Sequence, residues 1–301
     1  MKPSEYLAQL LKEQAITKDS SEAKELQAHR ADVEAVIMSA FAEDKPKIRY
    51  AGSYSKGTMI RDSYDLDIAC YFPETKDDTL PEIRQQVQTA LSEKYYITPK
   101  ASALRIEGIK DETEQMDYHI DVVPGRFVDD TETDAYLHVA YGEKERMKTN
   151  LDKHIAFVTN SGRQDILKLA KLWNSRNQIR AKSFVLDIFL IESFKGYTGT
   201  DLENAFKKAL QDIADRFETA QIVDPANTGN VVSKVMTDSE KQNVASRAKD
   251  ALQAIEDSED KTDAWKNVFL DTGQKTTASY YPPTPTAAPT PINAPLKPWS
   301  M

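Results

Sequence analysis

The run AGSYSKGTMIRDSYDLDIACYF, residues 51–72, constrains the fold of this chain more than any other stretch. It predicts a loop of small residues followed by a strand that carries Asp65 and Asp67 one residue apart. Side chains alternate between the two faces of an extended strand, so both carboxylates share one face while the intervening Leu66 points into the core. Two carboxylates on one face repel each other, and a bound divalent cation commonly offsets this repulsion.

The predicted loop before this strand has the composition of a phosphate-binding site. Its residues with accessible backbone N–H groups, hydroxyls or a positive charge are Gly52, Ser53, Lys56, Gly57 and Thr58. Successive backbone N–H groups in a turn bind anions, and a lysine among them adds a positive charge. Together with the two acids, this loop predicts a site for a metal ion and a nucleotide.

Composition narrows the class of protein. The 301 residues suffice for one large domain or two closely packed ones. No run approaches the roughly eighteen apolar residues of a membrane span, and the N-terminal sequence is typical of an amphipathic helix rather than of a signal peptide. We therefore expect a cytoplasmic protein. The single cysteine, Cys70, lies in an apolar run and is expected to be buried.

Charge and histidine spacing restrict the ligands. The net charge of −9 gives no sign of the basic surface with which proteins bind duplex DNA or RNA. The four histidines are far apart in sequence and have no cysteine partners, which argues against a zinc module. Any bound metal is therefore expected to be a hard cation with oxygen ligands.

Hydrophobic periodicity divides the chain into two halves. In the first half, helical patterns occupy residues 4–16, 19–43 and 83–91, and strand patterns occupy residues 47–53, 65–72, 96–109 and 115–128. Beyond Gly142 the strand signal ends, and helices are expected at residues 145–159, 163–179, 183–196, 201–219 and 238–256. Residues 279–301 hold seven of the fourteen prolines and are expected to be extended and mobile, either as a spacer or as a recognition peptide.

A third acid, Asp121, lies in the apolar run HIDVVP of the last strand pattern. If this strand lies beside the one carrying Asp65 and Asp67, three carboxylates converge on a pair of divalent ions, the arrangement used for phosphoryl or nucleotidyl transfer. The alternative is that the D-x-D sequence is a solvated strand edge. The loop upstream and the apolar setting of Asp121 favour the metal site.

These motifs resemble those of the polymerase-beta-type nucleotidyltransferase superfamily, whose members share a Gly-Ser motif, a D-x-D and a distal third acid. GSYSKGT followed by DLDIACYF is most similar to the bacterial cGAS/DncV-like nucleotidyltransferases (CD-NTases), which make cyclic di- and trinucleotide signals in anti-phage (CBASS) defence. In the second half, residues 167–174, 182–194 and 222–232 resemble three segments that recur in that order in those enzymes.

The resemblance implies an α+β fold with the active site in a cleft. Residues 1–145 would form a polymerase-beta-like core with a mixed sheet and N-terminal helices. Residues 146–278 would form a helical half like that of OAS and cGAS, and residues 279–301 a Pro-rich disordered tail. The cleft between the two halves would hold the nucleotides.

The resemblance also implies roles for individual residues. Asp65, Asp67 and Asp121 would be catalytic and would hold two Mg²⁺ ions, for which Mn²⁺ could substitute. The residues implied to bind the triphosphate are Gly52, Ser53, Lys56, Lys171 and Ser183, the last as the N-cap of its helix. A lysine on an amphipathic helix is otherwise a solvated residue, and a serine before an apolar helix is otherwise only a cap.

The implied reaction joins ATP and other NTPs into a cyclic di- or trinucleotide second messenger that contains adenine, with release of pyrophosphate. An effector protein would sense the product, and a HORMA-type protein is a candidate regulator. The sequence has no insertion like the zinc loop of the animal DNA sensor, and with the acidic charge this argues against activation by duplex DNA. The run DPANTGN, residues 224–230, keeps the corresponding family pattern only in part.

Two other functions stay open on the sequence alone. One is a tailing or adenylyl-transferring nucleotidyltransferase that acts on RNA, protein or a small molecule, although an enzyme acting on RNA usually shows a basic surface. The other is a catalytically inactive relative that only binds nucleotide. All three acids are present, so the sequence gives no positive support for an inactive protein.

Overall fold

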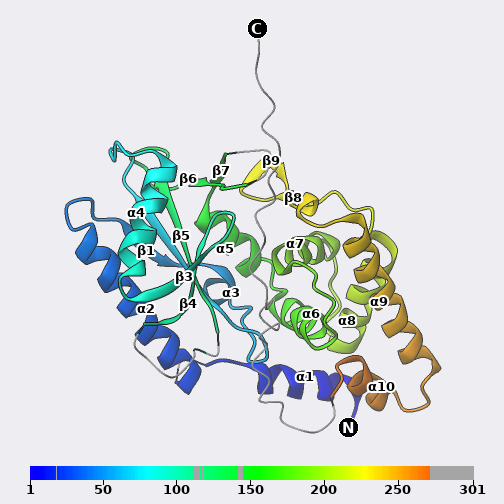
Figure 1. Cartoon of the computed structure of the whole chain (residues 1–301). Coiled ribbons are helices and arrows are strands. Elements are labelled where there is room, and N and C mark those ends of the chain that lie inside the picture. Colours follow the sequence, from blue (N-terminus) through cyan, green and yellow to red (C-terminus); the bar gives the residue numbers. More distant parts are fainter. Residues whose placement is uncertain (18, 111–115, 117, 142–144, 272–301) are drawn as a thin grey trace, which may run out of the picture.

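A β-sheet and a group of helices lie side by side in the computed structural model, which describes residues 1–17, 19–110, 116, 118–141 and 145–271 (Figure 1). The α+β prediction is confirmed. The predicted Pro-rich tail, residues 279–301, lies outside the described residues. In the ranges described, no helix combines the length and the apolar character needed to cross a lipid bilayer.

The sheet contains both parallel and antiparallel strands. Among the described residues its seven strands are β1 (Lys47–Tyr50), β2 (Leu66–Phe72), β3 (Tyr95–Pro99), β4 (Leu104–Ile109), β5 (Ile120–Phe127), β6 (Ala135–His138) and β7 (Arg146–Thr149). Their order is β1-β2-β5-β4-β3, with β6 paired to β5 and β7 to β6. β2 and β5 are parallel, and the other neighbours are antiparallel. β2 is almost continuously buried, as expected of a central strand covered on both faces.

Two helices, α2 (Ser21–Ala40) and α4 (Leu80–Ser92), pack on this sheet (Figure 1). α4 begins at the N-cap Thr79, which forms a capping box with Glu82. The core between these helices and the sheet includes Leu26, Val33, Ile68, Cys70, Ile83, Val87 and Val122. The prediction that Cys70 is buried is confirmed.

The helical half has its own core. Its helices are α5 (Leu151–Thr159), α6 (Gln164–Arg176), α7 (Ser183–Ser193), α8 (Leu202–Arg216), α9 (Asp238–Asp257) and α10 (Lys261–Val268), with a 3₁₀ turn at Val232–Val235. Trp173, Phe206 and Trp265 are fully buried at its centre. The N-terminal helix α1 (Pro3–Gln14) packs here as well, against α6, α8 and α10, and contributes Leu7 and Leu10 to the same core (Figure 1).

Several predicted boundaries were wrong. The strand signal does not end at Gly142, because β7 occupies part of the helix predicted at residues 145–159. That helix starts only after Asn150, whose side chain accepts the backbone N–H of Lys153 (2.9 Å) as an N-cap. β6 and α10 were not predicted. These elements are short, so the periodic signal they carry is weak.

The predicted strand over residues 47–53 also ends early. β1 stops at Tyr50, and Gly52, with φ of +59°, opens a five-residue helix, α3 (Gly52–Lys56). α3 ends at Gly57, which has a left-handed conformation (φ of +67°). The predicted glycine-containing loop is therefore a short helix with a glycine at each end.

A small hairpin, β8 (Val223–Asp224) and β9 (Asn227–Val231), joins the two halves. Asn227 donates a hydrogen bond from Nδ2 to the carbonyl oxygen of Lys148 in β7 (3.0 Å). Asp224 is buried and pairs with Nε2 of His154 in α5 (2.7 Å). Although burial opposes it, the contacts with His154 and the backbone N–H of Ala226 hold the pKa of Asp224 below its ordinary value.

Replacing Asp224 with alanine is expected to destabilise the protein by about 2 to 4 kcal/mol, because it leaves the buried His154 nitrogen and the Ala226 N–H without an acceptor. The lowered pKa of Asp224 means that its contribution is present above the unfolded-state pKa and is lost as the pH falls through the folded-state value. Urea unfolding of the two proteins should therefore give a difference at pH 7 that shrinks below about pH 4. An equal difference in unfolding free energy at pH 7 and below about pH 4 would contradict the assignment of this stabilisation to the ionised carboxylate of Asp224.

Candidate active site

The three predicted metal-binding acids come together at the N-terminal ends of the parallel strands β2 and β5. Asp67 and Asp121 are direct partners in the register of these strands. Directly paired residues point to the same face of a sheet, so their side chains are neighbours. Asp65 lies just before β2, two residues from Asp67. Their role as metal ligands stays a prediction.

Asp67 is the most perturbed of the three acids. Its pKa is raised to about 7, first by partial burial and then by repulsion from Asp65 and Asp121, whereas Lys171 and Lys56 act in the opposite direction. The ionised site therefore favours the arrival of a proton or a metal cation.

The Gly-Ser motif is packed directly against Asp67. The backbone N–H of Ala51 donates to the carbonyl oxygen of Asp67 (2.9 Å). A Cβ atom on Gly52 would lie 1.6 Å from Oδ2 of Asp67, which no real side chain could tolerate. Glycine is needed at position 52 both for this close approach and for its positive φ. The predicted phosphate loop and the predicted metal ligand are thus in contact.

The side-chain hydroxyl of Ser53 is buried and unsatisfied among the described residues. Its Oγ atom has no hydrogen-bond partner in the part of the chain that the structure describes. A buried hydroxyl usually has a partner, since an unsatisfied one costs free energy. A phosphate oxygen at this position would satisfy it, in agreement with the predicted role of Ser53.

Lys56 reaches from α3 toward the helical half. It is only 9% exposed, and its Nζ lies 4.8 Å from the centre of the Phe184 ring at the start of α7. Burial lowers the pKa of Lys56, while the nearby carboxylates of Asp187 and Asp67 raise it. Lys56 therefore interacts electrostatically with an acid of the sheet and with an acid of the helical half.

Asp187 of α7 was not singled out from the sequence. Burial raises its pKa to about 6, and the charges of Lys56 and Lys171 oppose this rise. The sequence did contain a signal, because Asp187 interrupts the apolar run FVLDIFLI. Lys171 of α6 interacts electrostatically with both Asp67 and Asp187. Its role in binding the triphosphate stays a prediction.

Ser183 does not have the predicted position in its helix. The N-cap of α7 is Lys182, and Ser183 is the first helical residue, exposed to solvent. No side-chain hydrogen bond caps the N-terminus of α7 in the described structure. The N-cap prediction is therefore wrong, and a contact between Ser183 and phosphate stays a prediction.

Arg105 of β4 is a second residue that the sequence did not single out. It is the direct register partner of Asp121. Its Nε donates to Oδ1 of Asp121 (2.8 Å) and its Nη2 to Oδ2 (2.7 Å). Both carboxylate oxygens of the third acid are thus already bound by a guanidinium.

Carboxylate oxygens, which the three acids supply, are ligands that hard divalent cations prefer. The three carboxylates nevertheless do not surround a common point. In the described ranges, no three His, Cys, Asp or Glu side chains are close enough to form a metal cage. Asp121, one of the three acids, is ion-paired with Arg105. The contact of Gly52 with Asp67 and the unsatisfied Ser53 hydroxyl nevertheless fit a bound nucleotide and cation.

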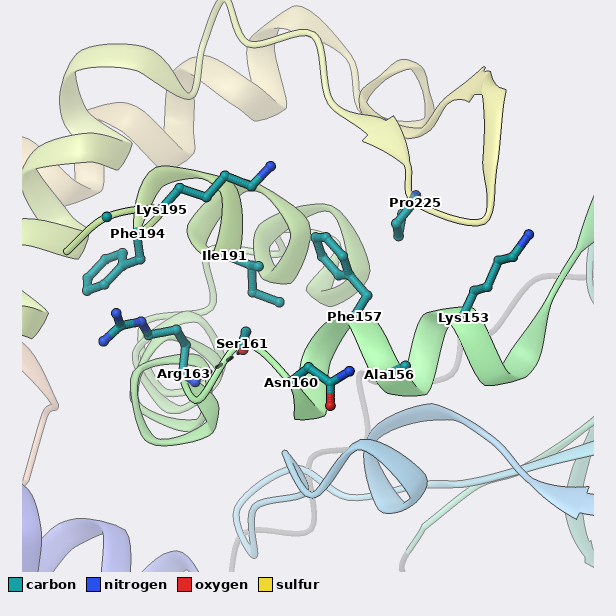
Figure 2. A pocket seen from close by; sticks show the side chains of 11 residues that line it. Lys153, Ala156, Phe157, Asn160, Ser161, Arg163, Ile191, Phe194, Lys195 and Pro225 are labelled. Atoms are coloured by element: carbon teal, nitrogen blue, oxygen red, sulfur yellow. Dashed lines mark hydrogen bonds between the residues drawn. The ribbon is translucent and has the colours of Figure 1, made fainter. Parts of the chain in front are cut away.

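A separate hollow of about 560 Å³ lies between α5 and the C-terminal end of α7 (Figure 2). Phe157, Ile191 and Phe194 contribute apolar surface, and Lys153 and Lys195 extend beside them (Figure 2). None of the three acids is among the described residues that line it. We therefore place the candidate active site at the acids and not at this hollow.

Part of the chain matches a known protein family. Residues 37–160, which include Gly52 and the three acids, match the family described as Nucleotidyltransferase domain. No curated protein was found to match the chain.

Solved structures share the fold over nearly the whole chain. E. coli MS115-1 CdnC, solved in a CdnC:HORMA-deltaN complex, is 17% identical with a TM-score of 0.69, over 89% of this chain and 97% of that one. The Bradyrhizobium diazoefficiens CD-NTase CdnG, solved with GTP, is 13% identical with a TM-score of 0.70, over 89% and 95% of the two chains. Vibrio cholerae DncV, a cyclic AMP-GMP synthase, is 15% identical with a TM-score of 0.60, over 92% and 86%. The fold implied by the sequence resemblance is confirmed.

Proposed function

We propose that this chain, a nucleotidyltransferase with the fold of the cGAS/DncV-like enzymes, joins ribonucleoside triphosphates into a cyclic oligonucleotide. The observation that carries this proposal is the pairing of Asp67 with Asp121 on adjacent parallel strands, with Gly52 packed against Asp67. This arrangement would bring the phosphates of a nucleotide bound at the start of α3 beside two carboxylates, as nucleotidyl transfer requires.

The residues have separable tasks in this proposal. Asp65, Asp67 and Asp121 would hold divalent cations, which when bound neutralise charge on the phosphates and lower the pKa of an attacking ribose hydroxyl. Ser53 would donate its hydroxyl to a phosphate oxygen, since that group has no partner in the described residues. Lys56 and Lys171 would add positive charge along the triphosphate, and Asp187 would keep both lysines directed into the site.

The proposal extends to the product and the partners. We expect ATP to be a substrate and adenine to be part of the product, which an effector protein would sense in anti-phage defence. We expect the reaction to take place in the cytoplasm. A HORMA-type regulator is a candidate partner, because CdnC, which shares this fold, was solved in a complex with HORMA-deltaN. Activation by duplex DNA is not expected, since the chain has a net charge of −9.

Incubating the purified protein with Mg²⁺ or Mn²⁺ and the four ribonucleoside triphosphates is expected to give a product that resists phosphatase, because a cyclic oligonucleotide has no terminal phosphate. Mass spectrometry identifies the bases and the ring size. Linear tails on added RNA, with no phosphatase-resistant product, would contradict the cyclic reaction and favour a tailing enzyme. Omitting each triphosphate in turn tests the expectation of adenine.

A further inference from the structure

Arg105 lies at one end of a row of charged side chains that crosses three strands. Arg105 of β4 is paired with Asp121 of β5, and Asp121 is paired with Asp67 of β2. Since direct partners share a face of the sheet, the three side chains point to the same side. Arg105 also interacts electrostatically with Asp65. The guanidinium thus directly contacts the row of acids through Asp121.

The contact with Asp121 is geometrically strong. Two N–H···O bonds of 2.8 and 2.7 Å join the two groups, and such two-point contacts are among the stronger charge-assisted hydrogen bonds. The side chains are 24% and 14% exposed, so water screens the pair less than it screens a surface ion pair. Each carboxylate oxygen has a second lone pair, but a cation using it would approach a fixed positive charge.

We propose that Arg105 is a positioning residue that holds Asp121 in the metal-free site and competes with divalent cations for its carboxylate. This inference rests on the proposed function, because it takes Asp121 to be a metal ligand. It explains why the described acids, although adjacent in register, do not form a cage. Nucleotide phosphates would favour cation binding by adding oxygen ligands and negative charge, so metal and substrate would bind together.

The test measures Mn²⁺ binding to the nucleotide-free full chain by calorimetry. Arg105→Gln removes the competing charge, so its Mn²⁺ affinity is expected to rise by about tenfold or more over the unchanged protein. Its maximum rate of pyrophosphate release is expected to fall, also by about tenfold, because Asp121 is no longer held in place. Arg105→Lys keeps the charge without the two-point contact and is expected to keep a Mn²⁺ affinity near that of the unchanged protein.

Arg49→Gln is the matched control. Arg49 makes a two-point contact with Asp152 rather than with any of the three acids, so its loss should leave both Mn²⁺ affinity and rate unchanged. Equal affinity in Arg105→Gln and the unchanged protein would overturn the inference and leave the proposed reaction intact. If Arg105→Gln does not fold, a reduced Mn²⁺ affinity in Arg105→Lys would overturn it as well. A lack of Mn²⁺ binding and of product in every protein would overturn the proposed function itself.

Discussion

Asp65→Asn/Asp67→Asn is expected to reduce nucleotidyl transfer by on the order of a thousandfold or more, because the amides no longer supply the anionic oxygens that hold a divalent cation. The assay is release of pyrophosphate at saturating Mg²⁺ or Mn²⁺. Asp165→Asn, at an exposed position of α6, controls for loss of an acid elsewhere. Full activity in the double variant would remove these acids from the mechanism.

The same acids should destabilise the metal-free fold. The folded-state pKa of Asp67, about 7, lies above its ordinary value of 3.8. As the pH rises between these values the unfolded chain loses its proton first, so ionisation of Asp67 increasingly opposes folding. Asp67→Asn removes this penalty and is expected to be more stable than the unchanged protein by about 1 to 3 kcal/mol at pH 8 in the presence of a chelator. The gain should shrink toward pH 4, as measured by urea unfolding.

Much of the core and part of the site could be predicted from local patterns. Alternation of acids and apolar residues located β2 and β5, and helical spacing of apolar residues located α2. Short edge strands such as β7 were not predicted, because a run of four residues carries little hydrophobic periodicity. The long strand pattern over residues 96–109 was in fact the hairpin β3–β4, whose turn lacks the usual glycine signals.

The missed site residues depend on which segments become neighbours. Arg105 is one basic residue in an alternating strand, and only the β4–β5 register shows that it faces Asp121. Asp187 was visible as an acid in an apolar helix, but its partners Lys56 and Lys171 come from two other helices. A single sequence predicts which residues of one helix or strand share a face and how far apart they are. The pairing between distant elements is instead set by tertiary packing.

Gly52→Ala is expected to damage both stability and activity because the new Cβ would displace the Asp67 carboxylate. The atom would lie 1.6 Å from Oδ2 and 2.5 Å from Cγ of Asp67, at a φ of +59°. The matched control is Gly162→Ala, which has a similar φ of +63° but an open space around the added Cβ. The control should lose only about 1 kcal/mol from the left-handed backbone. Gly52→Ala should lose about 2 to 4 kcal/mol and at least about a hundredfold in rate.

A double-mutant cycle separates the clash from the backbone cost. In an Asp67→Ala background the Oδ2 and Cγ atoms are gone, and the nearest remaining atom of residue 67 is Cβ at 2.9 Å. Gly52→Ala should therefore cost clearly less stability in that background, although still more than Gly162→Ala because the 2.9 Å approach remains, and the two substitutions should couple by at least about 1 kcal/mol. Additive losses would mean that Gly52 is required only for its backbone conformation. Coupling would show that contact between Gly52 and Asp67 helps to hold the start of α3 against β2.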